Sequence, residues 1–221
     1  MTTQTAFDKF QIKVNKNFET GSIAVDRGRF VIIFNEAQNK LIEYILDKKN
    51  EDDIRYIQKI LISDYPVSSS QSKMHYQDFQ LPKDYFDFSS VYATATKGEC
   101  KNKQMFLFEI KSDDKNEILQ DKFNKPSFLE REAPFNITSD NIRVYRDEFE
   151  INRIFLSYYR YPVQIKLLTE EDPESDFDNS INPEFDDKFV DRILSLATGE
   201  FELNSENPKF QANKLSAIQK I

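Results

Sequence analysis

The amino-acid sequence predicts an α+β protein in which the terminal helices pack together and an antiparallel β region is inserted between them. Helical periodicity fills the first 64 residues and returns after residue 183, whereas residues 65–168 alternate as strands do. Helices and strands that are segregated along the chain are typical of the α+β class. We therefore expect a helical part at 1–64, a β-rich insertion at 65–168, an acidic linker at 169–182, and a C-terminal helix and tail at 183–221.

The N-terminal part has apolar residues at the spacing of three helices. One apolar face runs over residues 7–18, with phenylalanine at three of its four positions, and a stronger one covers residues 30–45. The polar run at 50–53 is a plausible cap, because Asn and Asp side chains accept hydrogen bonds from free backbone N–H groups at a helix start. The third helix is expected to continue over residues 54–61.

The β region begins where Tyr65-Pro66 and a serine run break the helical period. Residues 91–96 alternate, Gly98-Glu99 provide a turn, and residues 105–110 form a second aromatic-rich run. This arrangement predicts a β-hairpin.

The remaining elements have weaker local signals. Residues 142–145 and 151–158 are expected to pair as a second hairpin, and residues 163–168 to add one more strand. Asn182-Pro183 is a typical helix start, since Asn caps and Pro suits the first helical position. Gly199 is the expected end of that helix.

The composition excludes several classes of active site. The 221 residues include four glycines, one His and one Cys, so neither a glycine-rich phosphate loop nor a four-ligand zinc site can form. We expect His75 to be an ordinary surface imidazole and Cys100 to be an unreactive thiol. The prediction is a protein without catalytic residues, bound metal or cofactors, and a carboxylate-based hydrolase is only a weak alternative.

The negative charge is concentrated in one segment. Residues 170–191 carry a net charge of −9, which leaves +1 for the rest of a chain whose total is −8. The segment is interpreted as a solvated linker, as a patch for a basic partner, or as a calcium loop. For calcium, Asp176, Asp178 and Asp187 have suitable spacing, but Ile181 occupies the position that requires glycine. The rest of the chain has too little positive charge for a general nucleic-acid surface. No stretch approaches the ~20 apolar residues of a membrane span.

The C-terminal tail, residues 200–221, places scattered apolar side chains among polar ones. Such a segment can form a short amphipathic helix but does not hold it alone in water. We therefore predict that it docks onto another subunit, although packing on its own domain remains open. The candidate assembly contacts are Phe201, Leu203, Phe210, Leu215, Ile218 and Ile221.

An ordered series of short motifs runs through the chain. These motifs lie at residues 7–18, 34–37, 81–85, 99–100, 125–128, 158–162 and 207–211. Taken together they resemble the head-to-tail connector, or neck, ring proteins of crAss-like podovirus bacteriophages.

This resemblance implies a virion structural protein and no enzyme. The expected partners are further copies of the chain in a ring, usually twelvefold, together with the portal protein and the adjacent ring or tail proteins. Genomic DNA would pass through the channel without sequence-specific binding, and the protein would be assembled in the bacterial cytoplasm. The alternative from the sequence is a soluble protein-binding module that acts through an exposed β-sheet edge.

Overall fold

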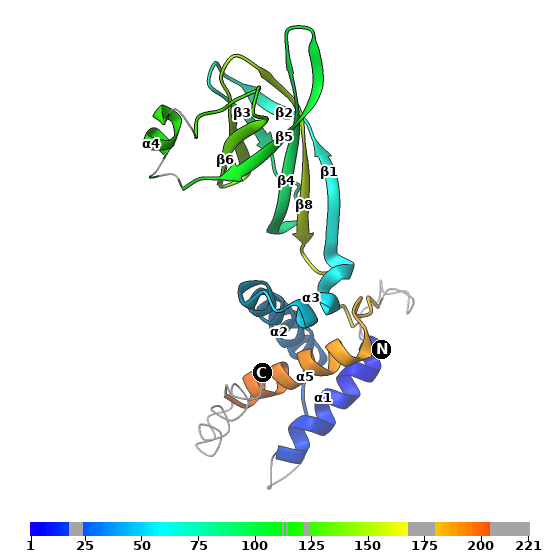
Figure 1. Cartoon of the computed structure of the whole chain (residues 1–221). Coiled ribbons are helices and arrows are strands. Elements are labelled where there is room, and N and C mark those ends of the chain that lie inside the picture. Colours follow the sequence, from blue (N-terminus) through cyan, green and yellow to red (C-terminus); the bar gives the residue numbers. More distant parts are fainter. Residues whose placement is uncertain (18–23, 112, 114, 122–123, 168–179, 204–221) are drawn as a thin grey trace. The chain divides into compact units, whose positions relative to one another are not determined.

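The computed structural model describes residues 1–17, 24–111, 113, 115–121, 124–167 and 180–203. The chain divides into two compact units (Figure 1). The helical unit combines Met1–Ile60 with Pro162–Ile221, and the β unit is Leu61–Tyr161. The α+β prediction is confirmed. The unit boundaries lie four and seven residues before the predicted ones, at 60/61 and 161/162.

The described part of the helical unit contains four α-helices and one 3-10 turn. These are α1 (Thr3–Asn17), α2 (Arg27–Lys48), α3 (Glu51–Ile57), the 3-10 turn η1 (Gln58–Ile60) and α5 (Asp187–Leu203). Helix α5 packs against both α1 and α2, so the two ends of the chain build one unit, as the sequence predicted (Figure 1). None of the described helices is long and apolar enough to cross a membrane.

Side-chain caps explain where the helices begin. The Asn50 side chain accepts a hydrogen bond from the Asp52 N–H at 3.2 Å, which confirms the predicted cap of α3. The predicted start of α5 at Asn182-Pro183 is wrong. The Asn182 side chain instead accepts the Thr3 N–H at 2.9 Å, and Asp186 caps the helix by accepting the Phe189 N–H at 2.8 Å.

The predicted end of α5 at Gly199 is also wrong. The helix continues to Leu203, and a Cβ added at Gly199 would meet no atom within 4 Å. Phe201, in this extra part of the helix, is 4% exposed. Burial of Phe201 outweighs the modest cost of a glycine inside a helix, about 1 kcal/mol.

Three phenylalanines from three helices form the centre of the helical unit. The Phe10 ring lies 5.2 Å from that of Phe30 and 5.7 Å from that of Phe201. Phe10 and Phe30 are fully buried. These tilted and edge-on contacts are the geometry that aromatic pairs prefer.

Asn35, on α2, fixes the chain where it returns from the β unit. Its amide donates to the Ile165 carbonyl at 3.3 Å and accepts the Ile165 N–H at 2.9 Å. In the described part of the expected strand at 163–168, residues 163–167, only Lys166 pairs, in an isolated bridge to Ile181. The backbone of Ile165 is bonded to the Asn35 side chain and not to a strand.

The β unit is an eight-stranded sheet with the order β1-β8-β4-β5-β6-β7-β3-β2. Its strands are β1 (Leu61–Val67), β2 (Ser69–Ser72), β3 (Tyr76–Gln80), β4 (Tyr85–Lys97), β5 (Cys100–Glu109), β6 (Glu132–Thr138), β7 (Asn141–Tyr145) and β8 (Glu150–Arg160). All neighbours are antiparallel except β5 and β6, and the short helix α4 (Lys115–Gln120) lies in the connection between these two.

The predicted β4–β5 hairpin is confirmed, with Gly98 at a φ of 58° in its turn. The predicted pairing of residues 142–145 with 151–158 is wrong. Strand β7 pairs with β3 and β6, whereas β8 pairs with β1 and β4. Strand β7 is bonded on one side to β6, the strand directly before it, and on the other side to the distant β3, whereas both partners of β8 are distant in sequence.

The two ends of the strand order are consecutive in the sequence. Strands β1 and β2 are separated only by Ser68, so the sheet curls on itself. Between β2 and the start of β8, an open groove of about 540 Å³ remains. The buried Gln77 side chain crosses this gap. It donates to the Ile151 carbonyl at 3.0 Å and accepts the Ile151 N–H at 2.7 Å. One side chain thus supplies the two hydrogen bonds that a paired strand would have made.

Candidate interaction surface

The outer face of the β unit carries a line of aromatic side chains across three neighbouring strands. Phe155 on β8 is the register partner of Tyr92 on β4, and Tyr92 is the partner of Phe106 on β5. We call these three residues the aromatic row. Pro66 on β1 extends the row by one more strand, since it is the register partner of Phe155.

The row faces outward because its neighbours along each strand face inward. Ala93 on β4 and Met105 on β5 are fully buried in the sheet core, and side chains alternate along a strand. Phe106 is 62% exposed. The rings of Tyr92 and Phe155 are stacked, with centroids 4.9 Å apart and planes at 14°. Exposed aromatic groups that lie side by side are typical of protein contact surfaces.

An open hollow of about 290 Å³ lies beside the row. Tyr92 and Phe106 line one part of it, and Glu130, Arg131 and Glu132 line another. The hollow therefore combines aromatic faces with a rim that carries two carboxylates and one guanidinium.

A polar cluster lies on the strands β3 and β7. Arg143 makes a two-pronged ion pair with Asp78, with Nε–Oδ1 at 2.8 Å and Nη2–Oδ2 at 2.9 Å. Its guanidinium lies over the Tyr76 ring, 4.1 Å from the centroid. The hydrogen bond to Asp78 raises the pKa of Arg143. This cluster joins two strands, and we assign it a structural role.

Replacing Arg143 by Lys should lower the free energy of unfolding of the β unit by about 1–2 kcal/mol, because one charge-assisted bond and the planar stacking are lost. Hydrogen exchange of the β3 and β7 amides measures the change. Arg153→Lys, at an exposed position on β8, is the matched control and should alter exchange by less than about 0.5 kcal/mol. Equal effects of both variants would contradict the assigned role.

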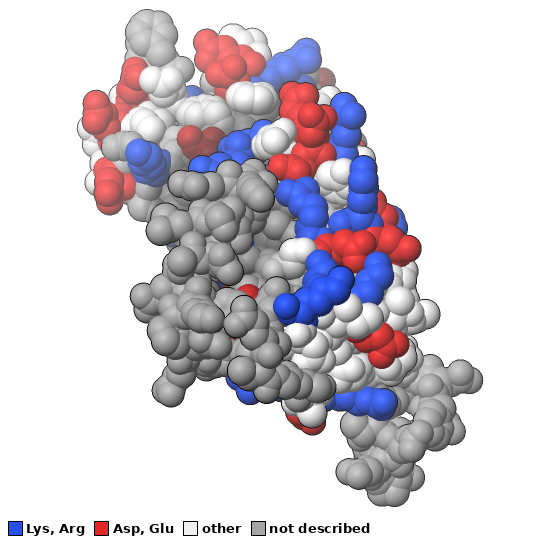
Figure 2. Space-filling model, turned by 90° about the horizontal axis from the view of Figure 1, so that it is seen from below, with Lys and Arg blue, Asp and Glu red and all other residues white. Residues whose placement is uncertain are grey.

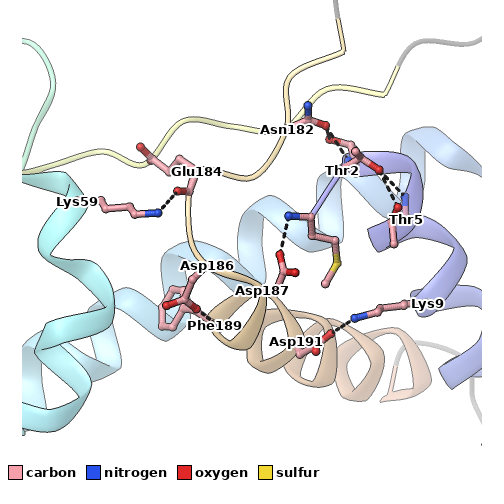
Figure 3. A network of polar contacts seen from close by, with 12 residues as sticks. Thr2, Thr5, Lys9, Lys59, Asn182, Glu184, Asp186, Asp187, Phe189 and Asp191 are labelled. Atoms are coloured by element: carbon pink, nitrogen blue, oxygen red, sulfur yellow. Dashed lines mark hydrogen bonds and ion pairs between the residues drawn. The ribbon is translucent and has the colours of Figure 1, made fainter.

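The described end of the acidic segment is used by the fold itself (Figure 3). Asp187 lies 2.6 Å from the Met1 amine and Asp191 lies 2.9 Å from Lys9 Nζ. The hydrogen bond to the amine lowers the pKa of Asp187. The Glu184 carboxylate accepts the Val163 N–H at 2.7 Å. These acidic side chains join α1 and the segment at Val163 to the start of α5.

This network bears on the calcium interpretation of the segment. The carboxylate of Asp187, the proposed ligand at the twelfth position of the loop, accepts a hydrogen bond from the Met1 amine. Asp176 and Asp178 lie outside the described residues, as does most of the predicted linker. Among the residues that the structure describes, no three acidic, His or Cys side chains gather as a metal site would require.

Two motifs that carried the resemblance lie together in the β unit. Within residues 81–85 and 158–162, the Tyr158 hydroxyl donates to the Asp84 carboxylate at 3.0 Å, and the Tyr161 N–H donates to the Asp84 carbonyl at 2.8 Å. Tyr85 stacks on Tyr158 with centroids 5.9 Å apart. Burial raises the pKa of both tyrosines to about 12, and in Tyr158 the bond to Asp84 adds to the effect. The motifs therefore join the start of β4 to the end of β8.

The sequence-predicted assembly contacts are not all available. Phe201 belongs to the core of the helical unit and offers little surface to another subunit. Leu203 is the last residue of α5. Phe210, Leu215, Ile218 and Ile221 lie outside the described residues.

The remaining candidate side chains are on the surface. His75 and Cys100 are both exposed. On the face drawn in Figure 2, basic and acidic side chains are interspersed and do not gather into one basic area. Sequence reasoning missed the aromatic row, although Tyr92 and Phe106 occupy positions in alternating strands where a solvated face would carry polar residues.

Comparison with known proteins adds no further constraint: no family model matches the chain, and no curated protein matches it either.

Proposed function

We propose that this chain is a subunit of a head-to-tail connector ring of a tailed bacteriophage, which joins the portal to the tail and forms part of the DNA channel. The observation that carries the proposal is the aromatic row, an apolar surface on a sheet whose other face is the buried core. The ordered motifs that resemble connector proteins give the more specific assignment.

A ring imposes a particular requirement on such a surface. In a closed ring each subunit contacts its neighbour through two different surfaces, so an apolar patch must meet a different patch on the next copy. The aromatic row can serve as one of these surfaces. Its core of stacked rings with a charged rim is the composition expected of a specific protein interface.

Assembly with the portal tests this proposal. The purified chain mixed with the portal protein of the same phage should form a large complex of fixed stoichiometry, measured by mass photometry. The free chain can be monomeric, because assembly of a neck onto a portal is commonly sequential. If the chain forms no complex with the portal at micromolar concentrations of both proteins, the proposal is contradicted.

A second candidate function is capture of a peptide through the edge strand β2. Within the described part of the chain this strand pairs only with β3, and the groove of about 540 Å³ lies beside it. An extended peptide could add to such an edge by backbone hydrogen bonds. A peptide that protects the amides of Ser69–Ser72 from hydrogen exchange would favour this function, whereas neighbouring genes for portal, capsid and tail proteins would favour the connector.

A further inference from the structure

We infer that the aromatic row receives the C-terminal segment, residues 204–221, of a neighbouring copy of the chain. The inference rests on the proposed function, because the ring is what requires the row to meet a different surface of the next copy. The contact joins a surface on the β unit of one copy to the segment that follows α5 in the next copy.

The sequence of the segment suits an apolar receptor. Phe210, Leu215, Ile218 and Ile221 fall within an arc of about 140° on a helical wheel. A short helix with this pattern gains stability mainly by burying its apolar face against another surface. Peptides of this type are bound in apolar grooves through a few anchoring side chains.

The dimensions of the two surfaces agree. Three neighbouring strands place the outer rings of the row about 10 Å apart. On a helix, the rise from Leu215 to Ile221 is about 9 Å. The three aliphatic side chains over this distance can therefore contact the three rings, while Phe210 reaches beyond the row to a neighbouring depression such as the hollow next to Phe106.

The charges also agree. Residues 207–221 contain three lysines and no acidic side chain. The rim of the hollow has Glu130 and Glu132 with a single opposing charge on Arg131. Complementary charge at the rim of an apolar contact sets the orientation of the partner more than it raises affinity.

Cross-linking of two full-length variants tests the contact without the portal. One copy carries Gln104→Cys beside the row, the other carries Ser216→Cys in the segment, and both carry Cys100→Ser. Under mild oxidation, the mixture should give a dimer of about 52 kDa, twice the chain mass of 26.1 kDa, and should form it much faster than either variant alone, whose like cysteines give a dimer of the same mass. Adding Phe106→Ser to the first copy should reduce the rate of dimer formation at least tenfold.

Two controls belong to this experiment. Met74→Ser removes an exposed apolar side chain outside the row and should leave the cross-linking rate unchanged. A copy that retains Cys100 in place of the Gln104 substitution should cross-link poorly, because Cys100 precedes Phe106 by six residues, about 20 Å along β5. Equal rates from Cys100, or no effect of Phe106→Ser, would overturn the inference.

Two further outcomes separate the inference from the proposed function. A single chain that carries both cysteines and closes on itself without forming dimers would mean that the segment binds its own β unit, which overturns the inference. If the Phe106→Ser chain assembles with the portal as the unchanged chain does, the proposed function stands and the inference fails. If the specific dimer forms but the portal is ignored, the inference stands and the function fails.

Discussion

Replacing Gln77 by Met should lower the midpoint of thermal unfolding of the β unit by about 15 °C. Methionine keeps the length of the side chain but leaves the buried N–H and C=O of Ile151 without partners. Each unsatisfied buried group costs about 1–3 kcal/mol, and 1 kcal/mol shifts the midpoint of a domain of this size by about 4–8 °C. Circular dichroism of the β signal during heating measures the shift.

The control for this variant is Gln71→Met on the neighbouring strand β2. Gln71 is exposed, so its replacement should change the midpoint by only a few degrees. Gln77→Ala should be worse than Gln77→Met, because it adds a cavity to the lost hydrogen bonds. A Gln77→Met protein with an unchanged midpoint would mean that water or a backbone shift replaces the bridge.

Phe10→Ala should lower the free energy of unfolding of the helical unit by about 3–5 kcal/mol. The side chain is fully buried between Phe30 and Phe201, and removal of a buried ring leaves a cavity that the surroundings fill only in part. Hydrogen exchange measures the effect separately in the amides of α1, α2 and α5.

Ile12→Ala is the matched control for Phe10→Ala. Ile12 lies on the same helix and is 56% exposed, so this variant should change exchange by less than about 0.5 kcal/mol. The exchange of the β-unit amides should not respond to Phe10→Ala, because the two units have separate cores. A uniform loss of protection throughout the chain would show that they unfold as one.

The helices could be predicted because their apolar spacing directly reports burial. Phe30, Phe34 and Leu41 recur at the helical period, and all three are buried in α2. The β4–β5 hairpin could be predicted because its turn joins strands that are adjacent in sequence. Local patterns were sufficient in both cases.

The partners of β8 could not be predicted in this way. Alternation identifies a strand but carries no information about a partner such as β1, which is more than 80 residues earlier in the chain. The nearest strand, β7, was therefore the natural but wrong choice. Long-range register depends on the packing of the whole core.

The two amide bridges were missed for another reason. Asn35 and Gln77 are polar, and polar residues are ordinarily expected at the surface. A signal for Gln77 does exist, because it shares a strand face with the fully buried Phe79 two residues later. A polar residue on an apolar face has to find hydrogen-bond partners, and Ile151 supplies them.

The pairing of the first and last strands of the β unit has a consequence for folding during synthesis. Leu61 and Tyr159 are register partners, so the whole β unit is complete once the ribosome has released residue 161. Helices α1 and α2 are made first, and Phe10 can contact Phe30 at once, but its contact with Phe201 forms only when α5 emerges. Helix α5, which is synthesised after the whole β unit, therefore completes the core of the helical unit, and until it emerges the apolar faces of α1 and α2 are the surfaces most in need of a chaperone.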